Sequence, residues 1–157
     1  MNITDHFTLE ELTNSKSHPE AVRLPNSAQV ENLKRVCGWL EVLRRVYNTR
    51  YQSPDGKEQP IIINSGYRCP MLNKAVGGSP SSNHLTGCAV DIHCPGATYY
   101  ERGKVAIRYA TLLLEIAEVR KENFDELIIE RKGTTWWIHF AVKEKDNRGK
   151  ITCITVC

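Results

Sequence analysis

Three side chains of the kinds that bind zinc are candidates for one shared site, and two of them lie in the short segment SSNHLTGCAVDIHC. His84 and Asp91 are seven residues apart, and Thr86-Gly87 between them is a natural bend. A loop histidine and a strand aspartate in this arrangement can converge on one metal ion. His139, in the apolar run TWWIHFAV, is a candidate third ligand from a separate strand. Three such ligands leave the fourth position of a zinc site open for water.

Each of these residues also has a plain structural interpretation. Taken alone, His84 and Asp91 are more simply a loop hydrogen bond, and His139 is more simply a half-buried histidine with one polar neighbour. His93 shares the strand face of Asp91, so it is an alternative ligand, a substrate contact or a neighbour of the ligands. Spacing by itself does not choose between these interpretations.

The segment SGYRCP places Tyr67 and Arg68 where a strand leads into a long loop. An arginine at this point either anchors the loop or faces a substrate. The planar guanidinium group matches a carboxylate or a developing oxyanion, so Arg68 is a candidate for holding either one. A long, mostly irregular connection inside a small domain is usually functional, but the residues alone leave both interpretations of Arg68 open.

The expected elements form an α+β domain over residues 1–157. Thr8 with Glu11, and Thr98 with Glu101, are capping boxes, and apolar residues at three- and four-residue intervals predict a long amphipathic helix. The expected helices are a short one after Thr8 and others at 26–48, 71–76 and 98–119. The expected strands are 61–64, 88–92, 125–131, 135–142 and 150–156. We predict a mostly antiparallel sheet with helices packed on one face.

The composition is that of an ordinary folded protein, with 41% hydrophobic and 25% charged residues. The net charge of +3 is too small and too dispersed to indicate nucleic acid as a partner. The start, MNITDHFTLEELTNS, has neither a signal peptide nor a membrane span, so we expect synthesis in the cytoplasm. There are six cysteines and no CxxC motif. We expect mostly free thiols, with Cys88 and Cys94 as packing residues, and the alternative is a disulfide that involves Cys69, Cys94 or the C-terminal pair.

The segment SSNHLTGCAVD contains S-x-H-x-x-G-x-A-x-D without a departure. It resembles the signature of the zinc D-Ala-D-Ala carboxypeptidases and L-alanyl-D-glutamate endopeptidases, whose fold is shared by Hedgehog signalling domains. Upstream, SGYRCPMLNKAVGGSP is similar to the companion motif of a smaller branch, in which a tyrosine-arginine pair precedes N-x-x-V-G-G. Downstream, WWIHF is similar to the W-[VI]-H ending of that branch. The three motifs occur in the expected order.

The resemblance implies a Zn²⁺ site with His84, Asp91 and His139 as ligands. It places Arg68 at the arginine that contacts the substrate or the oxyanion, and it makes Tyr67 and Ser82 further substrate-binding candidates. The implied reaction is cleavage of peptidoglycan stem peptides by metal-activated water, as a D,D-carboxypeptidase or an L-alanyl-D-glutamate-type endopeptidase.

We expect a monomer with a peptidoglycan peptide as its substrate and with neither nucleic acid nor membrane as a partner. Two sites of action remain open. The protein either acts on the cell wall after release, as a phage or prophage endolysin does, or recycles peptides in the cytoplasm.

The sequence departs from the family pattern at the residue that carries the proton. A zinc peptidase needs a carboxylate that accepts a proton from water and returns it to the leaving amine. Many relatives place it three residues before the last histidine ligand, where this chain has Trp136. A hairpin loop over Lys132–Thr135 would set Glu130 opposite Trp137 and diagonal to His139, which makes Glu130 the candidate general base. The alternative is a strand-end glutamate paired with a neighbouring basic residue.

Two other functions compete with this interpretation. Trp136 at the usual base position favours a zinc-containing binding or structural module without catalysis, as Hedgehog domains illustrate. A cysteine hydrolase would need a thiol beside a histidine, and Cys69 and Cys94 are its candidates, although no motif supports either.

Overall fold

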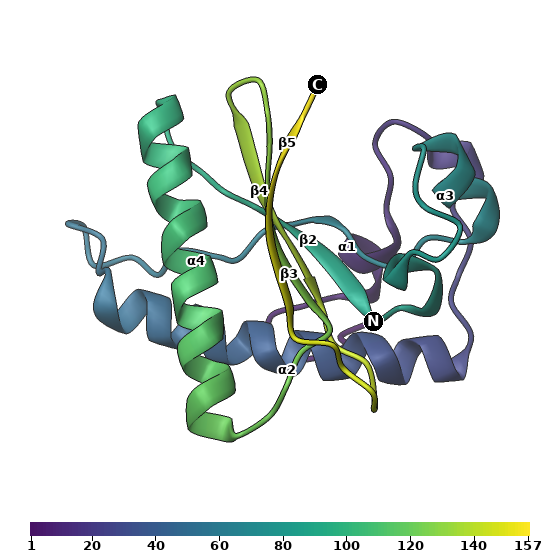
Figure 1. The fold of residues 1–157 in the computed structure, drawn as a ribbon, viewed down its shortest axis with the longest axis horizontal. Coiled ribbons are helices and arrows are strands. Elements are labelled where there is room, and N and C mark those ends of the chain that lie inside the picture. Colours follow the sequence, from purple (N-terminus) through teal and green to yellow (C-terminus); the bar gives the residue numbers. More distant parts are fainter.

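The computed structural model describes residues 1–157 and contains a five-stranded sheet with helices around it (Figure 1). The helices are α1 (Leu9–Thr13), α2 (Ser27–Arg50), α3 (Pro70–Ala75) and α4 (Tyr99–Arg120), with 3-10 turns η1 (Pro19–Ala21) and η2 (Asn83–Thr86). The strands are β1 (Ile63–Ser65), β2 (Ala89–His93), β3 (Glu126–Lys132), β4 (Thr135–Ala141) and β5 (Lys150–Val156). The predicted α+β class is confirmed. None of the helices combines the length and the apolar character needed to cross a bilayer.

Side-chain caps determine where the helices begin. Thr8 accepts a hydrogen bond from the backbone of Glu11 at the start of α1, and Thr98 does the same with Glu101 at the start of α4. In both places the glutamate side chain accepts from the cap backbone in return. Asn26 forms a third reciprocal pair at the start of α2. Caps of this kind stabilise a helix by about 1 kcal/mol each, because they satisfy N–H groups that have no partner within the helix.

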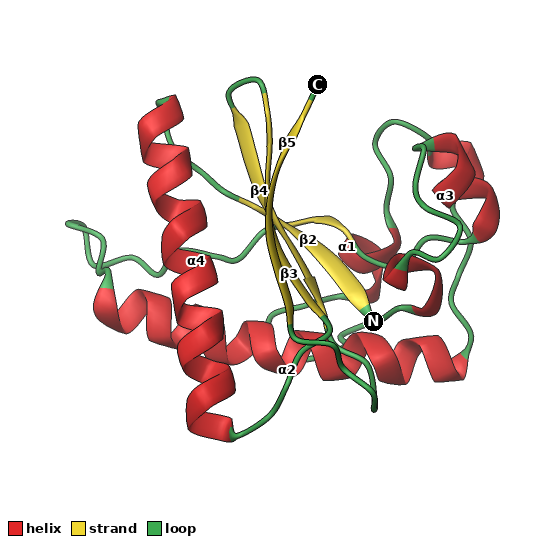
Figure 2. Cartoon of the chain, viewed as in Figure 1, coloured by secondary structure: helices red, strands yellow, loops and turns green.

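The two long helices cover one face of the sheet. Figure 2 shows the strands nearly edge-on, with α4 on one side of them and α3 on the other. The hydrophobic core lies between the sheet and the long helices, and it includes Leu40 of α2, Leu113 of α4 and Phe140 of β4. The ring of Phe140 lies 5.4 Å from that of Trp39, between ring centroids, so α2 is held directly against the centre of the sheet.

The strand order is β1-β2-β4-β3-β5, and the sheet is mixed rather than purely antiparallel. Three of the pairings are antiparallel, but β5 runs parallel to β3. The turn before β5 does not fold it back onto β4, because β2 and β3 already occupy both edges of β4. The chain instead passes beyond β3, and Lys150 begins β5 beside Glu126.

Alternation along the strands separates a hydrophobic face from a polar one. Val90 and Ile92 of β2, and Ile138 of β4, are fully buried on the helix side. Asp91 lies between Val90 and Ile92, and His139 lies between Ile138 and the buried Phe140, so both point to the opposite face, where no long helix packs. This face carries the residues of interest for function.

Candidate metal centre

His84, Asp91 and His139 converge on the polar face of the sheet. Asp91 on β2 is paired directly with His139 on β4, so adjacent strands set these two side chains next to each other. The Oδ1 atom of Asp91 lies 3.1 Å from Nδ1 of His139 and 3.3 Å from Nε2 of His84. One potential ligand atom from each residue lies within 4.8 Å of the others. The three residues that the sequence predicts as ligands are thus brought together.

His84 reaches this point from η2 because of the glycine that follows. Gly87 has φ +75°, in the left-handed region, and it turns the chain from η2 into β2. A Cβ at Gly87 would lie 2.6 Å from the carbonyl oxygen of Gln29 on α2, so this close approach also excludes a side chain. The glycine of the signature is therefore required by both backbone conformation and packing.

The unpaired nitrogen of His84 fits a metal ion. Its Nδ1 lies 2.6 Å from the carbonyl oxygen of Gly66 and donates to it, so Nε2 carries the lone pair. That Nε2 atom is buried and has no hydrogen-bond partner, and it faces Asp91 and His139. A buried acceptor without a partner is costly, and a zinc ion bound by nitrogen and carboxylate would satisfy it. The donor set is suited to zinc.

Arg68 is held against the aspartate of this group. Its Nη2 donates to Oδ2 of Asp91 at 2.8 Å, and its Nε donates to Ser65 at 2.8 Å. Oδ1 of Asp91 is thereby left to face the two histidines. Burial alone would raise the pKa of Asp91, but the nearby His84 and His139 outweigh it and hold that pKa far below its usual range. Arg68 also lines the cleft, and its contact with substrate stays a prediction.

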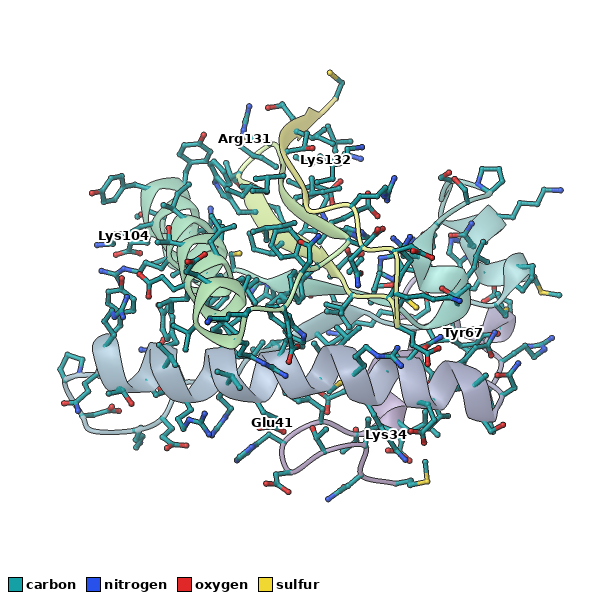
Figure 3. The ribbon with its side chains drawn as sticks, turned by 60° about the horizontal axis from the view of Figure 1, so that its bottom comes forward. Lys34, Glu41, Tyr67, Lys104, Arg131 and Lys132 are labelled. Carbon is teal, nitrogen blue, oxygen red and sulfur yellow. The ribbon has the colours of Figure 1, made fainter.

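The other two substrate-binding candidates occupy different environments. Ser82 lines the cleft and caps η2, since its hydroxyl accepts a hydrogen bond from the backbone N–H of His84 at 3.2 Å. Tyr67, labelled in Figure 3, is 7% exposed and belongs to the hydrophobic core. It is not among the residues that line the cleft. The structure therefore places Ser82 beside the metal group and leaves Tyr67 outside it.

Glu130 lies on the same face as the metal group. The register is the one predicted from the sequence, with Ile128 opposite His139 and Glu130 opposite Trp137. The hairpin is tighter than expected, because Lys132 and Thr135 are themselves paired. The indole N–H of Trp137 donates to the Glu130 carboxylate at 2.5 Å. Burial and the negative charge of Asp91 raise the pKa of Glu130, against opposing effects of Trp137 and the two histidines.

The alternative role for Glu130, as a strand-end partner of a basic neighbour, is wrong. Neither Arg131 nor Lys132 forms a salt bridge with it. Figure 3 shows both residues at the end of the β3–β4 hairpin, and Arg131 donates to Gly133 and Thr155 instead. Glu130 is available to the cleft.

Trp136 does not take the place of a general base in the cleft, because it lies on the other face of the sheet. Its ring lies 5.4 Å from that of Tyr99, between ring centroids, and it packs over Gly103 of α4. The residue three before His139 is therefore directed into the helix layer by strand alternation. A tryptophan at this position is therefore compatible with a general base supplied by a carboxylate from β3.

The cysteines and His93 stand outside the metal group. All six cysteines are free thiols. Cys69 caps α3 and its thiol donates to the carbonyl oxygen of Ala21, while burial raises the pKa of Cys94 to about 12. Neither lines the cleft, so neither is placed to act as a nucleophile. His93 pairs with Trp137 on the same face as Asp91, but it does not join the three ligands.

Sequence reasoning missed one acidic residue that contacts a predicted ligand. Glu126 lies 3.4 Å from Nε2 of His139, and Asn83 donates to it at 2.8 Å. The hydrogen bond with His139 lowers the pKa of Glu126, burial opposes this, and Arg148 adds to the lowering. Strand periodicity could have placed Glu126 on the face of Glu130, because the two are four residues apart.

A cleft of about 780 Å³ opens over these residues. The three predicted ligands and Glu130 line it together with Arg68 and the glycine pair of the N-x-x-V-G-G segment, and basic residues of the β4–β5 region line it as well. Those basic residues are Lys143, Arg148 and Lys150. The volume is within the range of sites that bind small molecules or short peptides.

An open three-ligand zinc site beside a carboxylate, in a cleft on an α+β sheet, is the arrangement of a zinc-dependent hydrolase. A family model described as Peptidase M15 matches residues 5–111, well over half of the chain, and the chain belongs to this family. The peptidases of this family are zinc-dependent. The match ends before β3 and β4, so His139 and Glu130 lie beyond it. No curated protein is matched by the chain.

Proposed function

We propose that this protein is a zinc metallopeptidase that cleaves peptidoglycan stem peptides. The observation that carries the proposal is the group of His84, Asp91 and His139, facing a cleft that Glu130 also lines, in a chain of the M15 family. The scissile bond is either D-Ala-D-Ala, for a carboxypeptidase, or L-alanyl-D-glutamate, for an endopeptidase. The site of action is the cell wall after release or the cytoplasm, and the protein acts as a monomer.

In this proposal, Glu130 and Arg68 have different roles in the reaction. When bound, zinc supplies Lewis-acid polarisation of a carbonyl oxygen and lowers the pKa of a water molecule. Glu130 accepts a proton from the attacking water and then delivers it to the leaving amine nitrogen. Its raised pKa suits both steps, because a group with a pKa nearer neutrality gives up a proton as readily as it takes one. Arg68, beside Asp91, stabilises negative charge that develops on the substrate.

The cleft also suits an anionic peptide. Stem peptides carry free carboxylates close to the scissile bond, and Lys150 lines the cleft without forming a salt bridge. Lys143 and Arg148 are different, because both are paired with the fully buried Asp125. Of these three basic residues, Lys150 is therefore the one that remains available to a substrate carboxylate.

The test combines metal analysis with substrate cleavage. Wild-type protein is expected to bind one zinc per chain and to release either D-alanine or the D-glutamyl fragment from purified muropeptides, as followed by liquid chromatography and mass spectrometry. His84→Ala is expected to lose zinc and to lower cleavage by about 1000-fold or more, since it removes one of three ligands. His18→Ala, a histidine that does not line the cleft, is the matched control.

Two results would contradict the proposal. The first is wild-type protein that binds no zinc, and the second is zinc-loaded protein that binds muropeptides but never turns them over. The second result would favour the non-catalytic zinc module. The identity of the released fragment separates carboxypeptidase from endopeptidase.

The pH dependence of cleavage should respond to Trp137. The active form of Glu130 is the carboxylate, so kcat/KM falls as pH drops through the pKa of Glu130, which burial and the charge of Asp91 raise in the metal-free protein. Trp137→Phe removes an N–H that favours the charged form. The limb is expected to move to higher pH by up to about one unit, which a pH series of kcat/KM would measure. An unshifted limb would contradict the assignment of that limb to Glu130.

A further inference from the structure

His139 has its two ring nitrogens facing two different carboxylates. Nδ1 lies 3.1 Å from Asp91 and Nε2 lies 3.4 Å from Glu126. A neutral imidazole carries a hydrogen on only one nitrogen, and a metal ion takes the lone pair of the other. If Asp91 and Nδ1 of His139 both bind the metal, the hydrogen of the ring must lie on Nε2, where the Glu126 carboxylate accepts it. His84 uses the opposite pair of atoms, since its Nδ1 donates to Gly66.

The carboxylate of Glu126 is held in place by groups other than His139. Asn83 donates to Oε1 of Glu126 at 2.8 Å, and Nη2 of Arg148 lies 3.5 Å from the same oxygen. The Glu126 side chain is 16% exposed, so little of it is free to move into solvent. The acceptor that faces His139 is thus fixed by contacts from η2 and from the connection between β4 and β5.

Asn83 is itself anchored, because it also donates to Oδ2 of Asp125 at 2.8 Å. Asp125 is fully buried and accepts hydrogen bonds from the side chain and the backbone of Arg148. Asn83 directly precedes His84, at the position that the S-x-H signature leaves free. One amide side chain therefore connects the turn that carries the first histidine ligand to the carboxylate that faces the last one.

We propose that Glu126 is a positioning residue that holds His139 with Nδ1 toward the metal, and that Asn83 positions Glu126 for this task. The inference rests on the proposed function, because it takes His84, Asp91 and His139 as zinc ligands. It adds to that function a carboxylate behind the last ligand, of the kind that raises metal affinity by fixing ring orientation. Neither residue touches the substrate in this role.

The experiment measures zinc affinity and the tautomer of His139, neither of which depends on turnover. Competition with a chromophoric chelator gives the zinc dissociation constant of wild type, Glu126→Ala, Glu126→Gln and Asn83→Ala. Glu126→Ala is expected to bind zinc 10- to 100-fold more weakly. Glu126→Gln keeps an acceptor oxygen and is expected to recover part of the loss. Asn83→Ala leaves Glu126 in place and is expected to lose less than Glu126→Ala.

The imidazole nitrogens report the tautomer directly. In ¹⁵N-labelled, zinc-loaded wild type, His139 is expected to carry its hydrogen on Nε2, and exchange of that hydrogen should be faster in Glu126→Ala than in Glu126→Gln. Glu118→Ala, an exposed glutamate on α4, is the matched control and should match wild type. Should Glu126→Ala fail to fold, Glu126→Gln and Asn83→Ala carry the same comparison.

Two outcomes overturn the inference in different ways. Wild-type zinc affinity in Glu126→Ala, or in both Glu126→Gln and Asn83→Ala where the alanine variant does not fold, removes the positioning role and leaves the proposed function standing. Wild-type protein that binds no zinc removes the proposed function, and the inference with it.

Discussion

Replacing Glu130 with glutamine is expected to lower kcat for muropeptide cleavage by about 1000-fold while leaving bound zinc unchanged. Glutamine has nearly the shape of glutamate and can still accept the hydrogen bond from Trp137. It cannot take a proton from water or return one to the leaving amine. The loss therefore falls on the chemical step, and KM should change little because no charge is removed from the substrate-holding groups.

The measurement pairs single-turnover cleavage with a zinc assay on the same samples. Glu118→Gln on the exposed side of α4 controls for the loss of a negative charge elsewhere on the protein. Full activity in Glu130→Gln would remove Glu130 as the base and direct attention to Glu126, the other glutamate that lines the cleft. A variant that loses both zinc and activity would instead indicate that Glu130 is needed for the metal site.

The parts of the site that local patterns determine were predictable from the sequence. His84 comes just before the bend at Gly87 and Asp91 lies in the strand just after it, so the bend can bring them together, and this needs no knowledge of the rest of the chain. The face that Glu130 occupies followed from the two-residue period of a strand and a hairpin loop over Lys132–Thr135, and the tighter hairpin of the structure keeps the same register. Both inferences rest on backbone geometry alone.

The parts that depend on tertiary packing were not predictable. A turn before β5 does not say which edge of the sheet the strand will join, and β5 joined β3 because β4 had no free edge. Tyr67 and Arg68 are adjacent in sequence, yet one is buried in the core and the other is paired with Asp91. The contact between Asn83 and Glu126 joins residues 43 positions apart, and it exists only because η2 lies over the start of β3.

Asp91→Asn is expected to weaken zinc binding by about 1000-fold and to abolish cleavage, because this one carboxylate serves three partners. Oδ1 faces both histidine ligands, and Oδ2 accepts from Arg68 at 2.8 Å. An asparagine has a single oxygen. Whichever way its amide is turned, an NH₂ group faces either the guanidinium group of Arg68 or the nitrogens that bind the metal.

Asp91→Asn should also be less stable than wild type when no metal is bound. This comparison separates the role of Asp91 in binding the metal from its role as the partner of Arg68. Arg68 is 15% exposed, and in Asp91→Asn its charge is left without a partner. We expect a loss of about 3 kcal/mol in the free energy of unfolding, measured by urea denaturation in excess chelator. The matched control is Asp5→Asn, which changes an exposed aspartate near the N-terminus, far from Asp91 in the sequence. If Asp91→Asn keeps wild-type zinc affinity but loses stability, Asp91 is a partner of Arg68 alone. If it binds zinc weakly but keeps its stability, Arg68 finds another acceptor when the carboxylate is gone.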